Sequence, residues 1–129
     1  MKKVFAAVLT AFLLISIAGC GSEPQHTVSY VSWKTIVVAD IDCIAVFTQY
    51  TNGSSETAIP ADEVSVKAFQ NGVEIPPIVP TGSRTEGYIQ CDASVQSGVT
   101  ADVVWIFQLD DDSTVSVELS GGEKVEITP

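Results

Sequence analysis

Three consecutive aspartates, Asp110, Asp111 and Asp112, are the densest group of metal-ligating side chains in the sequence. Carboxylate oxygens are the ligands that Ca2+ prefers, so this stretch suggests a calcium site. The spacing does not fit an EF-hand loop, which needs alternating ligands and a glycine at its sixth position. We therefore expect a solvated turn here, with the three aspartates as a weak metal candidate at most, and we expect no cofactor.

A hydrolytic site would need a nucleophile beside a base, and the sequence has a single histidine, His26. This residue falls in a short polar segment ahead of the first predicted strand, where no neighbouring element would orient its ring. The sequence also lacks a glycine-rich phosphate loop, a Gly-x-Ser-x-Gly elbow and a zinc-binding cluster. These observations predict that the protein is not an enzyme.

The N-terminus has the pattern of a bacterial export signal. Lys2 and Lys3 precede an apolar run over residues 4–18, which is too short for a membrane-spanning helix. The run ends in Ile-Ala-Gly-Cys, which resembles the lipobox of bacterial lipoproteins and implies cleavage before Cys20 and a lipid on its thiol. We expect a signal peptide over residues 1–19, lipidated Cys20 with a short tether over residues 20–27, and attachment to the cell membrane, facing the extracellular side.

Net charge narrows the class of partner. Without residues 1–19 the chain keeps 110 residues (129 − 19), enough for one domain, which we expect over residues 28–129. Its four basic side chains, Lys34, Lys67, Arg84 and Lys124, stand against 16 acidic ones, a net charge of −12 (4 − 16). Because phosphate backbones bind clustered Lys and Arg, a nucleic acid is excluded. The expected partners are the membrane, through the lipid, and an unidentified protein or cell-wall component.

Two cysteines remain once Cys20 is assigned to lipid, Cys43 and Cys91. Each lies on the apolar phase of an alternating stretch, so both are expected to face a core. Closing a loop of 48 positions (91 − 43) with a disulfide would stabilise the fold by about 4 kcal/mol. Two buried free thiols are the alternative. The oxidising compartment favours the disulfide.

Short runs of β-branched and aromatic residues recur between Gly, Pro, Asn and Asp, and no long stretch has a helical period. This pattern predicts an all-β fold, an immunoglobulin-like sandwich of two antiparallel sheets with about seven strands. The pair Asn71-Gly72 between two extended runs predicts a tight hairpin turn. The predicted strands lie within residues 28–38, 43–50, 64–75, 88–93, 99–109, 115–119 and 125–128.

The longest segment without a period, residues 76–87, is rich in Pro and Gly and predicts a surface loop. Its candidate binding residues are Pro76, Pro77, Pro80 and Arg84. Trp33 and Trp105 are expected in the core, with an exposed sugar-binding platform as the alternative.

Three motifs form a pattern together: a Thr-Asn pair followed by a Ser-acidic loop, a Phe-Gln-Asn-Gly-x-Glu-aliphatic hairpin, and a Phe-x-Leu-x-Asp strand end. The matching residues are Thr51, Asn52, Ser54 or Ser55, Phe69, Gln70, Asn71, Gly72, Glu74, Ile75, Gly98, Phe107, Leu109 and Asp111. With these motifs the chain resembles small lipoproteins of Gram-positive bacteria that share a domain of unknown function. The resemblance implies a telokin-like, immunoglobulin-type β-sandwich, similar to secreted mycobacterial immunoprotective antigens, and assigns no catalytic residue.

This sequence departs from that family pattern at three places. Gly53 stands where a second Asn is common, Ser97 stands where Pro often precedes the turn glycine, and the pair of cysteines is extra. Two functions fit the sequence: a binding module of the cell envelope, and a structural accessory domain without a specific ligand. We expect the first, and an exposed apolar patch on the folded domain would favour it.

Overall fold

The structure is a computed structural model that describes residues 25–80 and 84–129. The predicted signal peptide, Cys20 and most of the predicted tether lie outside the described residues. The described strands are β1 (His26–Val38), β2 (Ile41–Asn52), β3 (Val66–Gln70), β4 (Val73–Glu74), β5 (Pro77–Ile78), β6 (Ile89–Gln90), β7 (Thr100–Gln108), β8 (Val115–Leu119) and β9 (Lys124–Ile127). The all-β prediction is confirmed, with nine strands where about seven were expected. Within these ranges no helix has the length and apolarity needed to cross a membrane.

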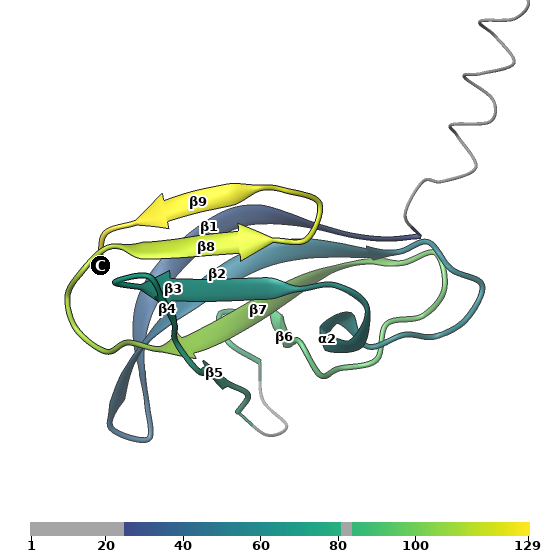
Figure 1. The fold of residues 1–129 in the computed structure, drawn as a ribbon. Coiled ribbons are helices and arrows are strands. Elements are labelled where there is room, and N and C mark those ends of the chain that lie inside the picture. The colour runs from purple at the N-terminus through teal and green to yellow at the C-terminus, as the bar shows by residue number, and fades with distance from the viewer. Residues whose placement is uncertain (1–24, 81–83) are drawn as a thin grey trace, which may run out of the picture.

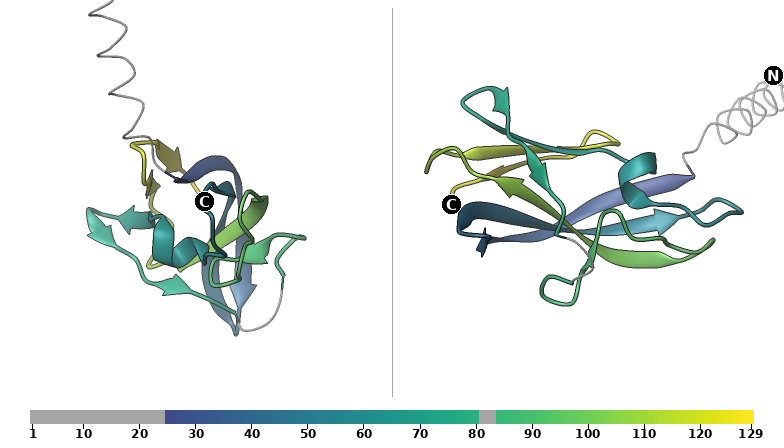
Figure 2. Two further views of the ribbon diagram at one scale, coloured as in Figure 1. Left: turned by 90° about the vertical axis from the view of Figure 1, so that its right-hand side faces the viewer. Right: turned by 90° about the horizontal axis from the view of Figure 1, so that it is seen from below.

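The strands form two sheets that pack face to face (Figure 1). One sheet has the order β1-β2-β7-β5, with β6 added to β7, and the other has the order β4-β3-β8-β9. Written in immunoglobulin letters these orders are A-B-E-D and C′-C-F-G, which is the strand order of that fold. All of these pairings are antiparallel except β6 with β7. The right-hand view of Figure 2 separates the two layers.

The main core fills the space between the two sheets. Because side chains alternate along a strand, every second residue of β2, β7 and β8 points into this space. The buried residues that these strands supply are Ile44, Val46, Tyr50, Val103, Trp105, Phe107, Val115, Val117 and Leu119.

A second apolar cluster lies on the outer face of the first sheet. It contains Ala45, Phe47, Val104 and Ile106 from the alternate positions of β2 and β7. Tyr88 covers this face, with its ring centroid 4.6 Å from that of Phe47. The middle of β7 is therefore buried on both faces, as predicted for a central strand.

Two tight turns have both central residues in the left-handed region. Asn71 and Gly72 have φ of 54° and 79° and join β3 to β4, which confirms the predicted hairpin. Ala39 and Asp40, with φ of 51° and 65°, join β1 to β2 in the same way. The predicted loop over residues 76–87 is wrong in its first part, because Pro77–Ile78 forms β5 and pairs with β7 at the sheet edge.

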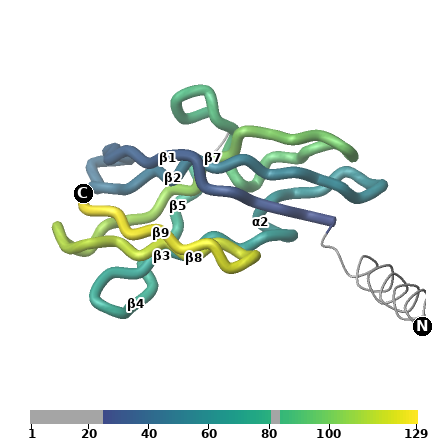
Figure 3. The backbone as a smooth tube through the Cα atoms, turned by 90° about the horizontal axis from the view of Figure 1, so that it is seen from above, coloured from purple at the N-terminus to yellow at the C-terminus, as the bar shows by residue number. Residues whose placement is uncertain are grey.

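Strand β1 is the long edge of the first sheet, and it begins at His26, inside the predicted tether. Its register shifts between Tyr30 and Ser32, so the strand bulges at its middle. The amide of Tyr30 donates a hydrogen bond to the Glu123 carboxylate (3.0 Å), from the turn between β8 and β9. The start of β1 and the C-terminus lie at opposite ends of the domain (Figure 3).

Candidate functional site

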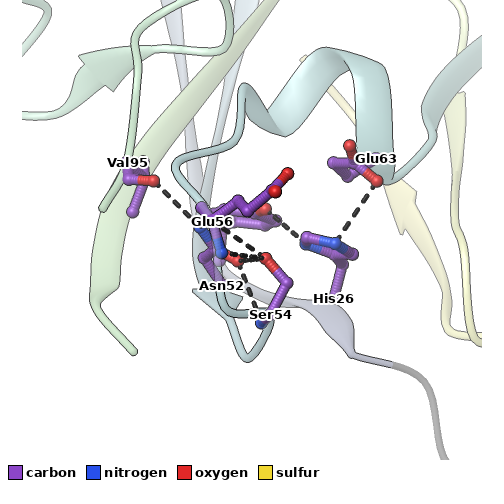
Figure 4. Close-up of polar contacts among 7 residues, drawn as sticks. His26, Asn52, Ser54, Glu56, Glu63 and Val95 are labelled. Carbon is purple, nitrogen blue, oxygen red and sulfur yellow. Dashed lines mark hydrogen bonds and ion pairs between the residues drawn. The ribbon is translucent and has the colours of Figure 1, made fainter. Parts of the chain in front are cut away.

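His26 is held at the end of the domain where the described chain begins (Figure 4). Its Nδ1 lies 2.7 Å from the Tyr50 hydroxyl, and its Nε2 lies 3.3 Å from the Glu63 carboxylate. Glu63 comes from a short unpredicted helix, α2 (Pro60–Glu63), which begins with proline at a position that suits it. The expectation that nothing orients His26 is therefore wrong, because partners from two other elements, β2 and α2, hold its ring.

The contacts of His26, Tyr50 and Glu63 are structural, because they hold neighbouring elements together. The imidazole stacks on the Tyr50 ring at a centroid distance of 6.0 Å and an interplanar angle of 8°. Burial, and then the negative charge of Glu63, raise the pKa of Tyr50, so the phenol keeps its proton. Both ring nitrogens of His26 are engaged, and they tie β1 to β2 and α2.

His26 with Tyr50 and Glu63 forms one polar hub, and Asn52 is the centre of a second polar hub beside it (Figure 4). Its side chain is fully buried and donates to the carbonyls of Glu56 (2.8 Å) and Val95 (2.9 Å). Its Oδ1 accepts from the amide (3.1 Å) and the hydroxyl (2.6 Å) of Ser54. The Thr-Asn and Ser-acidic motif of the family resemblance is thus a loop built around one amide side chain.

Gly53 departs from the family pattern for a steric reason. Its amide donates to the Gln25 carbonyl (2.7 Å), and a Cβ at this position would lie 2.6 Å from that oxygen. A side chain here would push the start of β1 away from β2, so glycine is required.

The three aspartates form the turn between β7 and β8, and Gln70 braces it from β3. Gln70 is buried, its Nε2 donates to the carbonyls of Asp111 (3.0 Å) and Ser113 (2.9 Å), and its Oε1 accepts from the Asp110 amide (2.7 Å). The Asp111 carboxylate accepts from the hydroxyl and amide of Ser113 and from the Asn71 side chain. Hydrogen bonds from Ser113, then from Asn71, lower the pKa of Asp111. Asp111 therefore serves the turn, as predicted for a solvated turn.

No group of three or more His, Cys, Asp or Glu side chains is placed to hold a metal ion anywhere in residues 25–80 and 84–129. Asp110, Asp111 and Asp112 instead line a cavity of about 330 Å3 at the end of the sandwich near the C-terminus. Asp42 also lines it, placed there because its carbonyl accepts from the Leu109 amide (3.0 Å). The apolar side chains that line the cavity include Ile36, Val37, Leu109 and Pro129.

An exposed row on β1 leads toward this cavity. Trp33, Thr35 and Val37 occupy alternate positions and so share one face of the strand. Trp33 is 37% exposed and Val37 is 65% exposed, whereas Trp105 is buried in the core. The core prediction is confirmed for Trp105, which lies on the central strand β7, and wrong for Trp33, which lies on the edge strand β1.

The predicted disulfide is wrong, because Cys43 and Cys91 are both free and buried. Cys43 belongs to the cluster on the outer face of the first sheet, with its thiol 3.4 Å from the Ile41 carbonyl. Cys91 packs against the core between the sheets. The sheet separates the two thiols, and burial raises the pKa of Cys91 to about 11.

The candidate residues of the predicted binding loop have different surroundings. The Pro76 carbonyl accepts from the Gln108 amide (3.0 Å), Pro77 lies in β5, and Pro80 is half-buried. Arg84 is exposed and donates to the nearby Gly87 carbonyl (3.2 Å). Residues 81–83 of this loop lie outside the described residues.

Sequence reasoning missed Trp33, Asp42 and Pro129 as residues of one surface. The signal that was available was the run of three aspartates at a strand end, which marks one wall of the cavity.

The family description "Domain of unknown function (DUF5067)" matches residues 22–121. The chain belongs to the DUF5067 family. The matched span covers β1 to β8 and includes both polar hubs, the exposed row and the aspartate turn, while β9 and Pro129 lie beyond it. Comparison with curated proteins and with solved structures returns no match.

Proposed function

We propose that the protein is a lipid-anchored binding module of the bacterial cell envelope, facing the extracellular side. The basic start, the short apolar run and the Ile-Ala-Gly-Cys end support an anchor on Cys20. The immunoglobulin strand order of the two sheets supports the telokin-like relationship. Sandwiches of this kind commonly bind their partners at one end, which is consistent with a binding module.

The exposed row on β1 is the observation that carries this proposal. Trp33 and Val37 keep large apolar surface in solvent on a domain that is otherwise strongly acidic. Aromatic side chains are enriched where proteins bind partners, because one ring buries much area at low entropic cost. β1 itself contains no carboxylate. A partner can therefore meet this strand without burying an unpaired negative charge.

The position of the row fits an anchor at the other end. Nine residue steps separate His26 from Thr35, which at about 3.3 Å per residue is about 30 Å. A lipid on Cys20 would hold the His26 end near the membrane. The row and the cavity would then face away from the lipid, toward envelope components.

Crosslinking in living bacteria tests the proposal. A photoreactive amino acid replaces Val37 in one strain and Val73 in another, because the two valines have nearly equal exposure (65% and 64%) on different sheets. We expect a discrete crosslinked product from position 37 and none from position 73. Blank results from both positions would favour the structural accessory role instead.

A separate measurement tests the anchor. Cells fed a palmitate analogue should label the protein, and Cys20→Ala should abolish the label. Labelling that persists in Cys20→Ala would contradict the lipoprotein part of the proposal.

A further inference from the structure

The cavity beside the exposed row has a mixed lining. Ile36, Val37, Leu109 and Pro129 give it apolar surface, and Asp42 and the three turn aspartates give it carboxylates. Its volume of about 330 Å3 is at the small end of the range for ligand pockets and suits a single long side chain.

Three of the cavity carboxylates have no cationic partner in the described part of the chain. The ion pairs found there are His26 with Glu63 and Lys34 with Glu86, and neither lies at the cavity. Asp111 is occupied by the turn, which leaves Asp42, Asp110 and Asp112. Like charges gathered at one cavity repel each other, so a cation that enters is favoured.

The apolar walls discriminate between kinds of cation. A bare metal ion needs a cage of oxygen ligands, and the described residues contain no group of three or more ligands placed for one. Lys and Arg side chains combine an apolar stem with a charged head, and they bury the stem while the head stays near water or a carboxylate. The lining of the cavity offers both kinds of contact, with Val37 and Leu109 for the stem and the aspartates for the head.

We propose that this cavity binds a Lys or Arg side chain from an extended peptide segment of the partner. The inference rests on the proposed function, since the same partner would lie along the row on β1. Trp33, Thr35 and Val37 follow each other at two-residue spacing, and alternate side chains of an extended peptide have the same spacing. An apolar residue against Trp33 and a basic residue in the cavity would then belong to one segment.

Short peptides test the ligand class on the full chain in detergent micelles. Three blocked pentapeptides carry Lys, Arg or the neutral norleucine at the centre and are otherwise identical. Binding is followed through the NMR signals of the Val37 and Leu109 methyl groups. We expect the Lys and Arg peptides to bind at least about tenfold more tightly than the norleucine peptide, and more weakly as salt is added.

Two double variants with the same change in net charge separate the cavity from the overall acidity. Asp110→Asn with Asp112→Asn removes charge at the cavity, and Asp62→Asn with Asp92→Asn removes it from exposed positions elsewhere. We expect the first variant to lose at least about tenfold in affinity for the Lys peptide and the second to lose less than about twofold.

Four results would overturn the inference. Equal losses in the two variants would mean attraction to net charge alone, Ca2+ producing the same methyl shifts would mean a metal site, and no binding of the Lys peptide would mean an unsuitable cavity. Crosslinking from position 37 that persists unchanged in Asp110→Asn with Asp112→Asn would leave the binding module standing and refute the cavity ligand.

Discussion

Replacing Asn52 by alanine should destabilise the domain more than any other polar substitution in its loop. The buried side chain makes four hydrogen bonds, to Glu56, Val95 and twice to Ser54. Each contributes about 1 kcal/mol net, but two of the partners keep another donor. The Val95 carbonyl still accepts from Ala58 and the Glu56 carbonyl from Ser54. We therefore expect a loss of about 3 kcal/mol in the free energy of unfolding.

Urea unfolding measures this loss, provided that the dependence of the free energy of unfolding on urea concentration (the m-value) is the same in both proteins. Thermal unfolding should show a midpoint lower by about 15 °C. Ser54→Ala is the matched control, because it removes the hydroxyl and leaves the amide bonded to Asn52. It should lose about 1 kcal/mol. A loss below about 1 kcal/mol in Asn52→Ala, or a loss equal to that of the control, would refute the role of Asn52 as a hub.

Three further predictions follow from other buried groups. Burial raises the Cys91 pKa from 9.0 to about 11, so the thiol of the unfolded chain ionises at lower pH than the thiol of the folded one. The free energy of unfolding should therefore fall by roughly 2–3 kcal/mol between pH 9 and pH 11. Urea unfolding across this range should show the fall, and Cys91→Ala should lack this contribution. Acrylamide should quench the fluorescence of Trp105→Phe, which retains the exposed Trp33, more strongly than that of Trp33→Phe, and the reverse order would contradict the exposures described above. Gln70→Ala should cost about 2 kcal/mol and open the turn between β7 and β8 to proteases, whereas unchanged proteolysis would show that the turn holds itself.

Local sequence patterns predicted the strands well, because a strand in a sandwich requires apolar and polar side chains to alternate along the chain. Residues 115–119 form β8 as expected, and residues 99–109 contain β7 at Thr100–Gln108. The Asn71-Gly72 turn was predictable because its dihedral angles demand those residue types. His26 was missed because its partners, Tyr50 and Glu63, are 24 and 37 positions away (63 − 26) and no periodicity links them.

The disulfide between Cys43 and Cys91 was predicted wrongly for a physical reason. Alternation assigned Cys43 to an apolar face, and that face is indeed buried. Because β2 is apolar on both sides, however, the apolar phase does not say which of the two faces a residue joins. The cavity was missed for a related reason, since it forms where Asp42, Leu109 and Pro129 meet from distant parts of the chain.

The bulge in β1 bears on how copies of the protein behave when crowded together. A thirteen-residue edge strand offers a long row of backbone groups on which another copy could add a strand and start aggregation. The register shift after Tyr30 breaks this row at its middle, and the Glu123 carboxylate occupies the Tyr30 amide. Neither half of the strand then offers a long, regular template. Neighbouring copies can therefore lie side by side at high concentration and remain separate molecules.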